Sequence, residues 1–136
     1  MITSSLILCA DRVIRDAETN NISIINILEE MTPEGLPLFI ARVMIFALLH
    51  RDKEKDPSQI KCTLRIGIGD NRLLERELNV DFRDKGRNRT IINIGGLVIS
   101  TSGILEASLF LEERLLNQFR FIVHAPRQID VTKQEA

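Results

Sequence analysis

The chain has 136 residues, of which 44% are hydrophobic and 27% charged, with 18 basic and 19 acidic side chains. A chain of this length forms one domain and buries enough surface to fold without disulfides or metal ions. Because the net charge is near zero, no overall electrostatic field attracts the protein to nucleic acid or to anionic membranes. The lack of Trp and Tyr argues against a sugar-binding or antibody-like surface. We expect a single domain over residues 1–127 and a polar tail over 128–136.

No segment of the sequence looks like a targeting signal or a membrane span. The start, Met1–Ser5, has no basic residue, and the apolar stretch Leu6–Ala10 is too short for a signal peptide. No window reaches the roughly 18 apolar residues that a transmembrane helix needs. We therefore expect a cytoplasmic protein without a membrane anchor.

The hydrophobic pattern predicts secondary-structure elements that are all strands. Between residues 60 and 82, apolar and polar side chains alternate on both sides of the turn residues Gly69-Asp70-Asn71, which indicates a β-hairpin. The spacing is typical of a sandwich or barrel. In chain order the predicted strands are Leu6–Ile14, Ile22–Leu28, Leu36–His50, Ile60–Ile68, Leu74–Phe82, Ile91–Ser100, Leu105–Leu111 and Phe119–Val123.

The closing segment, residues 104–123, fits two structures. Apolar residues alternate as in a hairpin with its turn at Glu112-Glu113-Arg114, but they also form a helical stripe. We favour strands because aromatic and β-branched residues cluster at 119–123. The fold prediction is thus an all-β antiparallel sandwich of about eight strands, immunoglobulin-like or C2-like.

Two predicted strands are apolar on both faces, although a sandwich strand normally buries only one. These are Leu36–His50 and Ile91–Ser100, the second interrupted by Gly95-Gly96, which indicates a bulge or a close backbone approach. A bare apolar patch of this size is rare on a monomer, so we expect a cover: a helix formed by residues 6–17, a second copy, or another protein. A homodimer is the commonest solution. The candidate interface residues are Arg42, Met44, Phe46, Leu97 and Ile99.

The order of elements resembles a family of small all-β proteins of bacteria and phages that is known only as a domain of unknown function. The matching segments are Leu8–Asp11, Asn21–Ile27, Leu36–Leu38, Asn93–Leu97 with Gly103, and Leu115–Val123. The resemblance implies a β-sandwich and no activity. The sequence departs from the pattern at Glu112–Arg114, where an Asp-Gly turn is expected.

Candidate catalytic and metal-binding residues are few. His50 and His124 end predicted strands, and no nucleophile or third ligand accompanies either of them in the sequence. Cys9 and Cys62 lie in apolar or alternating runs, so we expect inert core thiols. We expect no catalytic residue, metal or cofactor; an enzyme or small-ligand site near His50 or His124 is the alternative.

One loop, Arg83–Arg89, is strongly basic. Its side chains Arg83, Lys85, Arg87 and Arg89 suit phosphate contacts. However, no aromatic residues are interleaved to stack on bases, which argues against nucleic acid as the partner. The interpretation that we favour is a non-enzymatic protein–protein interaction module that self-associates; nucleic-acid contact through this loop ranks third, after the enzyme or ligand-binding alternative.

Overall fold

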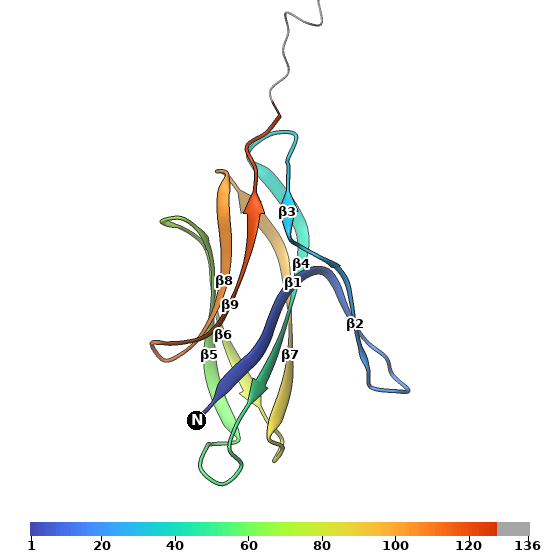
Figure 1. Cartoon of the computed structure of the whole chain (residues 1–136), viewed down its shortest axis with the longest axis vertical. Coiled ribbons are helices and arrows are strands. Elements are labelled where there is room, and N and C mark those ends of the chain that lie inside the picture. Colours follow the sequence, from blue (N-terminus) through green and yellow to red (C-terminus); the bar gives the residue numbers. More distant parts are fainter. Residues whose placement is uncertain (128–136) are drawn as a thin grey trace, which may run out of the picture.

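A computed structural model describes residues 1–127 as two β-sheets packed face to face (Figure 1). The all-β sandwich is thereby confirmed. The nine strands are β1 (Thr3–Arg15), β2 (Ile22–Ile27), β3 (Glu30–Met31), β4 (Leu38–His50), β5 (Gln59–Ile68), β6 (Asn71–Asp81), β7 (Arg87–Ile99), β8 (Gly103–Leu111) and β9 (Arg114–Val123). The expected tail, residues 128–136, lies outside the described residues.

The first sheet has the strand order β2-β1-β4-β7, and the second has the order β3-β9-β8-β5-β6. All pairs are antiparallel except β3 with β9, and the two-residue β3 is the strand that the sequence pattern missed. The hairpin over residues 60–82 is confirmed. Residues 1–127 contain no helix, and so none that is long and apolar enough to cross a membrane.

Residues 104–123 form a hairpin and not a helix, because β8 pairs with β9 along its whole length. The turn between them holds Glu112 at a φ of 57°. That left-handed conformation is the one that favours Gly or Asn. The departure from an Asp-Gly turn therefore leaves the hairpin intact and places a Glu in a disfavoured backbone region.

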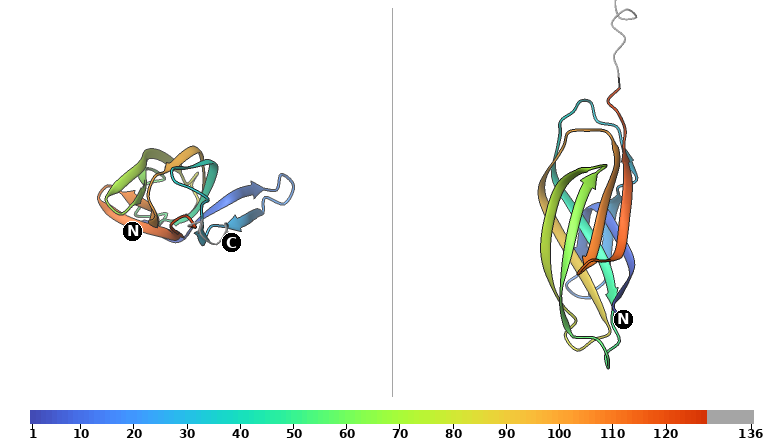
Figure 2. Two further views of the ribbon diagram at one scale, coloured as in Figure 1. Left: turned by 90° about the horizontal axis from the view of Figure 1, so that it is seen from above. Right: turned by 90° about the vertical axis from the view of Figure 1, so that its left-hand side faces the viewer.

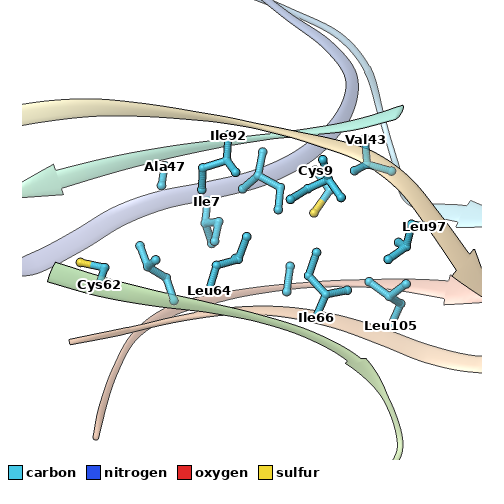
Figure 3. Close-up of a cluster of buried hydrophobic side chains, with 14 of the residues drawn as sticks. Ile7, Cys9, Val43, Ala47, Cys62, Leu64, Ile66, Ile92, Leu97 and Leu105 are labelled. Atoms are coloured by element: carbon cyan, nitrogen blue, oxygen red, sulfur yellow. The ribbon is translucent and has the colours of Figure 1, made fainter. Parts of the chain in front are cut away.

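The core lies between the sheets and is made almost entirely of aliphatic side chains (Figure 3). The side chains of Ile7, Val43 and Ile92 from the first sheet face Leu64 and Ile66 from the second. Cys9 and Cys62 belong to this layer and are 1% and 0% exposed, which confirms them as core residues. Burial raises the pKa of the Cys9 thiol to about 12 and that of Cys62 to about 11, which disfavours the reactive thiolate form of both.

Polar side chains close the two seams where the sheets meet. At one seam Arg76 of β6 donates a hydrogen bond from Nη1 to the carbonyl of Asn93 in β7 (3.1 Å). At the other, Arg114 of β9 donates to the carbonyl of Ile2 (2.7 Å), just before β1. Arg76 breaks the alternation of its strand because it occupies a core-facing position at a sheet edge, where its guanidinium reaches across to the other sheet.

In both β4 and β7, the set of alternate residues that faces the core switches partway along the strand. Leu38 and Ile40 pack on the core, but further along β4 the core residues are Val43, Ile45, Ala47 and Leu49. In β7 the core residues change from Ile92 and Ile94 to Leu97 and Ile99. The two switch points lie next to each other across the paired strands. Arg42 of β4 is paired with Gly95 of β7, and the adjacent Gly96 has a φ of 81°. Because both strands shift together, their pairing register is kept.

This changeover corrects the predicted interface. Leu97 and Ile99 are 4% and 0% exposed and lie in the core, so their assignment to an outer apolar face was wrong. The error arose because a constant alternation was assumed through Gly95-Gly96. The pairing of β4 with β7 has no register shift at these glycines, so the expected bulge is not present; Gly96 instead has a φ of 81°, and the residues after it face the opposite side of the sheet.

The hairpin of β1 and β2 leaves the sandwich (Figures 1 and 2). β1 pairs with β4 only as far as Ala10 and beyond it pairs with β2 alone. We call residues 11–27 the arm. At its base Asn26 has a φ of 56° and donates to the carboxylate of Asp11 (3.1 Å). Residues 6–17, expected as an alternative to be a covering helix, are strand and turn.

Candidate functional site

A large cleft lies between the tip of the arm and the connection from β6 to β7. Its volume is about 990 Å³. The arm contributes Arg15 and residues 19–21, and the connection contributes residues 79, 81–83 and 85–89. Two segments more than fifty residues apart in the sequence therefore form its two walls.

The charge of the lining residues is strongly positive. The four predicted phosphate-contact residues all line this cleft, and the arm adds a fifth cation; the five are Arg15, Arg83, Lys85, Arg87 and Arg89. The one acidic lining residue is Asp81, whose Oδ1 accepts a hydrogen bond from the backbone N–H of Arg83 (2.9 Å). Within residues 1–127, none of the five cations forms an ion pair.

The β6–β7 connection is tighter than the sequence pattern indicated. β7 begins at Arg87, so Arg87 and Arg89 are strand residues and not loop residues, which corrects the predicted loop 83–89. The remaining turn is closed by a hydrogen bond from the N–H of Lys85 to the carbonyl of Phe82 (3.0 Å). Arg83 and Asp84 have φ values of 51° and 62°. Two successive non-glycine residues in the left-handed region are uncommon and cost conformational energy.

Arg89 joins the two walls of the cleft. Its Nη1 donates to the carbonyl of Asn20 at the arm tip, at 2.6 Å. Arg89 is half-buried, whereas Arg15, Arg83 and Arg87 are exposed. No pattern in the sequence indicates that Arg15 or Asn20 approaches residues 83–89, because the course of β1 away from the sandwich depends on tertiary packing.

The free edge of β2 is a second candidate site. β2 is the outermost strand of its sheet, and its six residues, Ile-Ser-Ile-Ile-Asn-Ile, include no charged side chain. Ile25 and Ile27 are 41% and 45% exposed, and Ile14 on the neighbouring strand is 39% exposed. Native proteins usually protect such an edge with charge, proline or extreme shortness.

The opposite side of the arm is turned toward the sandwich. Val13 is 6% exposed, and the Sδ atom of Met44 on β4 lies 3.4 Å from its backbone nitrogen. Of the remaining predicted interface residues, Arg42 is exposed, Met44 is half-buried and Phe46 is 5% exposed. The outer apolar face of β4 is thus covered in part by the chain's own arm. This cover is a hairpin, which the sequence did not anticipate.

The two histidines do not converge. His50 ends β4 and His124 follows β9, and these strand ends lie at opposite ends of the sandwich (Figure 1). His50 Nε2 is 2.7 Å from the Oγ of Ser5, a nucleophile–base contact, but within residues 1–127 no carboxylate bonds to its ring. His124 Nε2 is 3.0 Å from a carboxylate oxygen of Glu30, both side chains being well exposed. The described residues hold no group of three or more potential metal ligands.

A protein-family model and solved structures are similar to this chain. Among curated proteins, none matches this chain. Among solved structures, an immunoglobulin-like protein from Pseudomonas aeruginosa aligns with 91% of this chain and 97% of its own, at 15% identity and a TM-score of 0.43. The model of a family of unknown function (DUF6941) matches residues 5–124. This match covers most of the chain, which therefore belongs to that family.

Proposed function

We propose that this protein is a non-enzymatic protein–protein interaction module that self-associates through the free edge of β2. The observation that carries the proposal is the composition of that edge. Six successive residues without a charge lie on a hairpin that stands away from the sandwich (Figure 2). Their unpaired backbone groups on the outer side are a template for another strand.

A second copy of the chain is the occupant that this edge fits best. Two identical strands related by a two-fold axis pair in antiparallel fashion, so one surface serves both partners. The pairing would join two four-stranded sheets into one continuous sheet across the axis. Because β2 carries no charge, the pairing brings no like charges together.

Exposed isoleucines add an apolar component to the same surface. Ile14, Ile25 and Ile27 lie on the solvent side of the arm, next to the edge. In a dimer these side chains would be removed from water, at about 25 cal/mol for each Å² of apolar area buried. This contribution supplements the backbone hydrogen bonds.

Sedimentation equilibrium tests the proposal. Interference optics are needed because the chain has no Trp or Tyr. At micromolar concentrations we expect a mass near twice 15.5 kDa. Ile25→Lys, which places a charge beside the edge, should weaken self-association by at least about tenfold, since one lysine is a common protection of edge strands.

The matched control is Ile104→Lys on β8, where the isoleucine is 51% exposed and belongs to the other sheet. It should associate like the wild type. A wild-type mass of 15.5 kDa across the concentration range would contradict self-association. Equal weakening by both lysine variants would contradict the assignment to β2.

A further inference from the structure

We propose that the cleft between the arm tip and the β6–β7 turn binds a ligand that carries two or more phosphate groups. The proposal is independent of self-association, because it rests on the charges of the cleft and not on the edge of β2. None of the residues that line the cleft belongs to β2.

The charge of the cleft is the first argument. Five cationic side chains line it, and none of them forms an ion pair with a carboxylate of residues 1–127; Asp81, the one acidic lining residue, accepts a hydrogen bond from the backbone N–H of Arg83. The whole chain has a net charge of −1, so this excess is local. Four of the five are arginines, whose planar guanidinium groups bind phosphate oxygens in a bidentate manner.

The arrangement of the cations is the second argument. Arg15 stands on the arm, Arg83 and Arg87 stand on the opposite wall, and Arg89 connects the walls through Asn20. Cations on both walls favour a ligand with several separated negative groups over a single small anion. A volume of about 990 Å³ is at the upper end of ordinary ligand clefts.

The chemistry of the lining selects phosphate groups over rings. The one aromatic residue at the cleft is Phe82, which is 1% exposed and has the Arg51 guanidinium 5.5 Å from its ring centroid. It offers no open face on which a base stacks, and stacking is a main source of single-strand affinity in nucleic-acid-binding domains. The ligand is therefore recognised through phosphate groups, which are supplied by a free oligophosphate or by a nucleic-acid backbone.

Isothermal titration calorimetry of the full chain at low and physiological salt tests the proposal. The probes are inorganic tripolyphosphate, ATP and a 20-nucleotide single-stranded oligothymidylate. Tripolyphosphate and ATP should bind alike, because no ring contact is available, and both should weaken as salt rises. A stronger affinity for the oligonucleotide assigns a nucleic-acid backbone as the source, and a weaker or equal one assigns a free oligophosphate.

Two variants locate the binding. The double variant Arg83→Ser with Arg87→Ser removes two exposed side chains from one wall, and Arg15→Ser removes one from the arm. We expect a loss of about tenfold or more for the double variant and about threefold or more for Arg15→Ser, in line with charge-assisted phosphate contacts. The loss of affinity for Arg15→Ser is the more decisive test, because a ligand bound only by the basic β6–β7 turn would not depend on a side chain of the arm.

The control is the double variant Arg120→Ser with Arg127→Ser, which removes the same number of exposed cations from β9 and the residues just after it, in the other sheet. Its affinity should stay within about twofold of the wild type, as expected for sites distant from the cleft. The proposal is overturned if none of the probes binds at low salt, or if the control loses as much affinity as the cleft variants. It is also overturned if Arg15→Ser binds like the wild type.

Discussion

The two outer hairpins of the molecule treat their free edges differently. The edge strand of the β5–β6 hairpin, β6, carries Arg72, Glu75, Arg76, Glu77 and Asp81 among eleven residues. Glu75 pairs with Arg65 and Arg72, and Arg76 reaches the opposite sheet. The edge strand of the β1–β2 hairpin, β2, has no charge at all. The edge of β6 therefore carries the charges that usually protect a strand against association, and the edge of β2 carries none.

The difference also extends to the packing. β5 keeps one face in the core from Ile60 to Ile68, so its hairpin is held along its whole length. β1 leaves the sandwich after Ala10, and the contacts that tie the arm back are the approach of Met44 to Val13 and the hydrogen bond from Arg89 to Asn20. We infer that the arm is the least stable part of the fold and the part available for binding.

The largest expected effect is a difference between the two hairpins in how much a core truncation lowers the free energy of unfolding. Leu64→Ala on β5 removes a side chain that is 0% exposed and should lower the free energy of unfolding by about 2–5 kcal/mol. Val13→Ala on the arm should cost about 1–2 kcal/mol, because it removes two methylene-sized groups from a smaller contact. Chemical denaturation followed by circular dichroism measures both. A loss for Val13→Ala as large as that for Leu64→Ala would mean that the arm is an integral part of the core.

An effect of intermediate size, on self-association, is expected when charged residues are removed from the edge strand β6. Replacing Arg72 and Glu77 with Ile leaves the net charge unchanged and keeps the pair between Glu75 and Arg65. The double variant should unfold within about 0.5 kcal/mol of the wild type, since both positions are exposed. Its mass in sedimentation should nevertheless exceed that of the wild type, because an edge with fewer charges pairs more readily with other strands. Unchanged association would show that charge is not what separates β6 from β2.

The smallest effect concerns the tip of the arm. Hydrogen bonds from the backbone N–H groups of Thr19 and Glu18 lower the pKa of Asp16 below its ordinary value of 3.8. The stabilisation is therefore present above the unfolded pKa and is lost as pH falls through the lower folded pKa. In an NMR titration, the amide signals of Thr19 and Glu18 should move with a midpoint below 3.8, and Asp16→Asn should abolish the movement. A midpoint at or above 3.8 would mean that the turn is not formed in solution.

The sequence predicted well where one face is buried throughout. Residues 60–82 alternate without a break, apart from Arg76, and they form the expected hairpin. Prediction failed where two strands change faces together, because period-two counting assumes a constant phase and placed Leu97 and Ile99 outside. Gly95-Gly96 marked the position of the change, but which residues face the core after it depends on how the partner strand β4 responds.

The candidate cleft was predictable only in part. The basic residues 83–89 stand out by charge, and those named in advance all line the cleft. Arg15 does not stand out, since a single arginine before a polar turn is ordinary. Its place beside the β6–β7 turn follows from the bend of β1 at Asp11, and such a bend leaves no periodic signal in the sequence.

The seam between β1 and β9 has a consequence for how the protein is made. Arg114 donates to the carbonyl of Ile2, and Asn117 donates to that of Ser4, across separations of 112 and 113 residues. At about 5–20 residues per second, a ribosome needs roughly 5–20 s to add that length of chain. During this interval β1 can pair with β2 and β4, but the side of the sandwich that β9 closes stays open to water. Ile2, which is 4% exposed in the finished protein and lies at this seam, is therefore covered only late in synthesis.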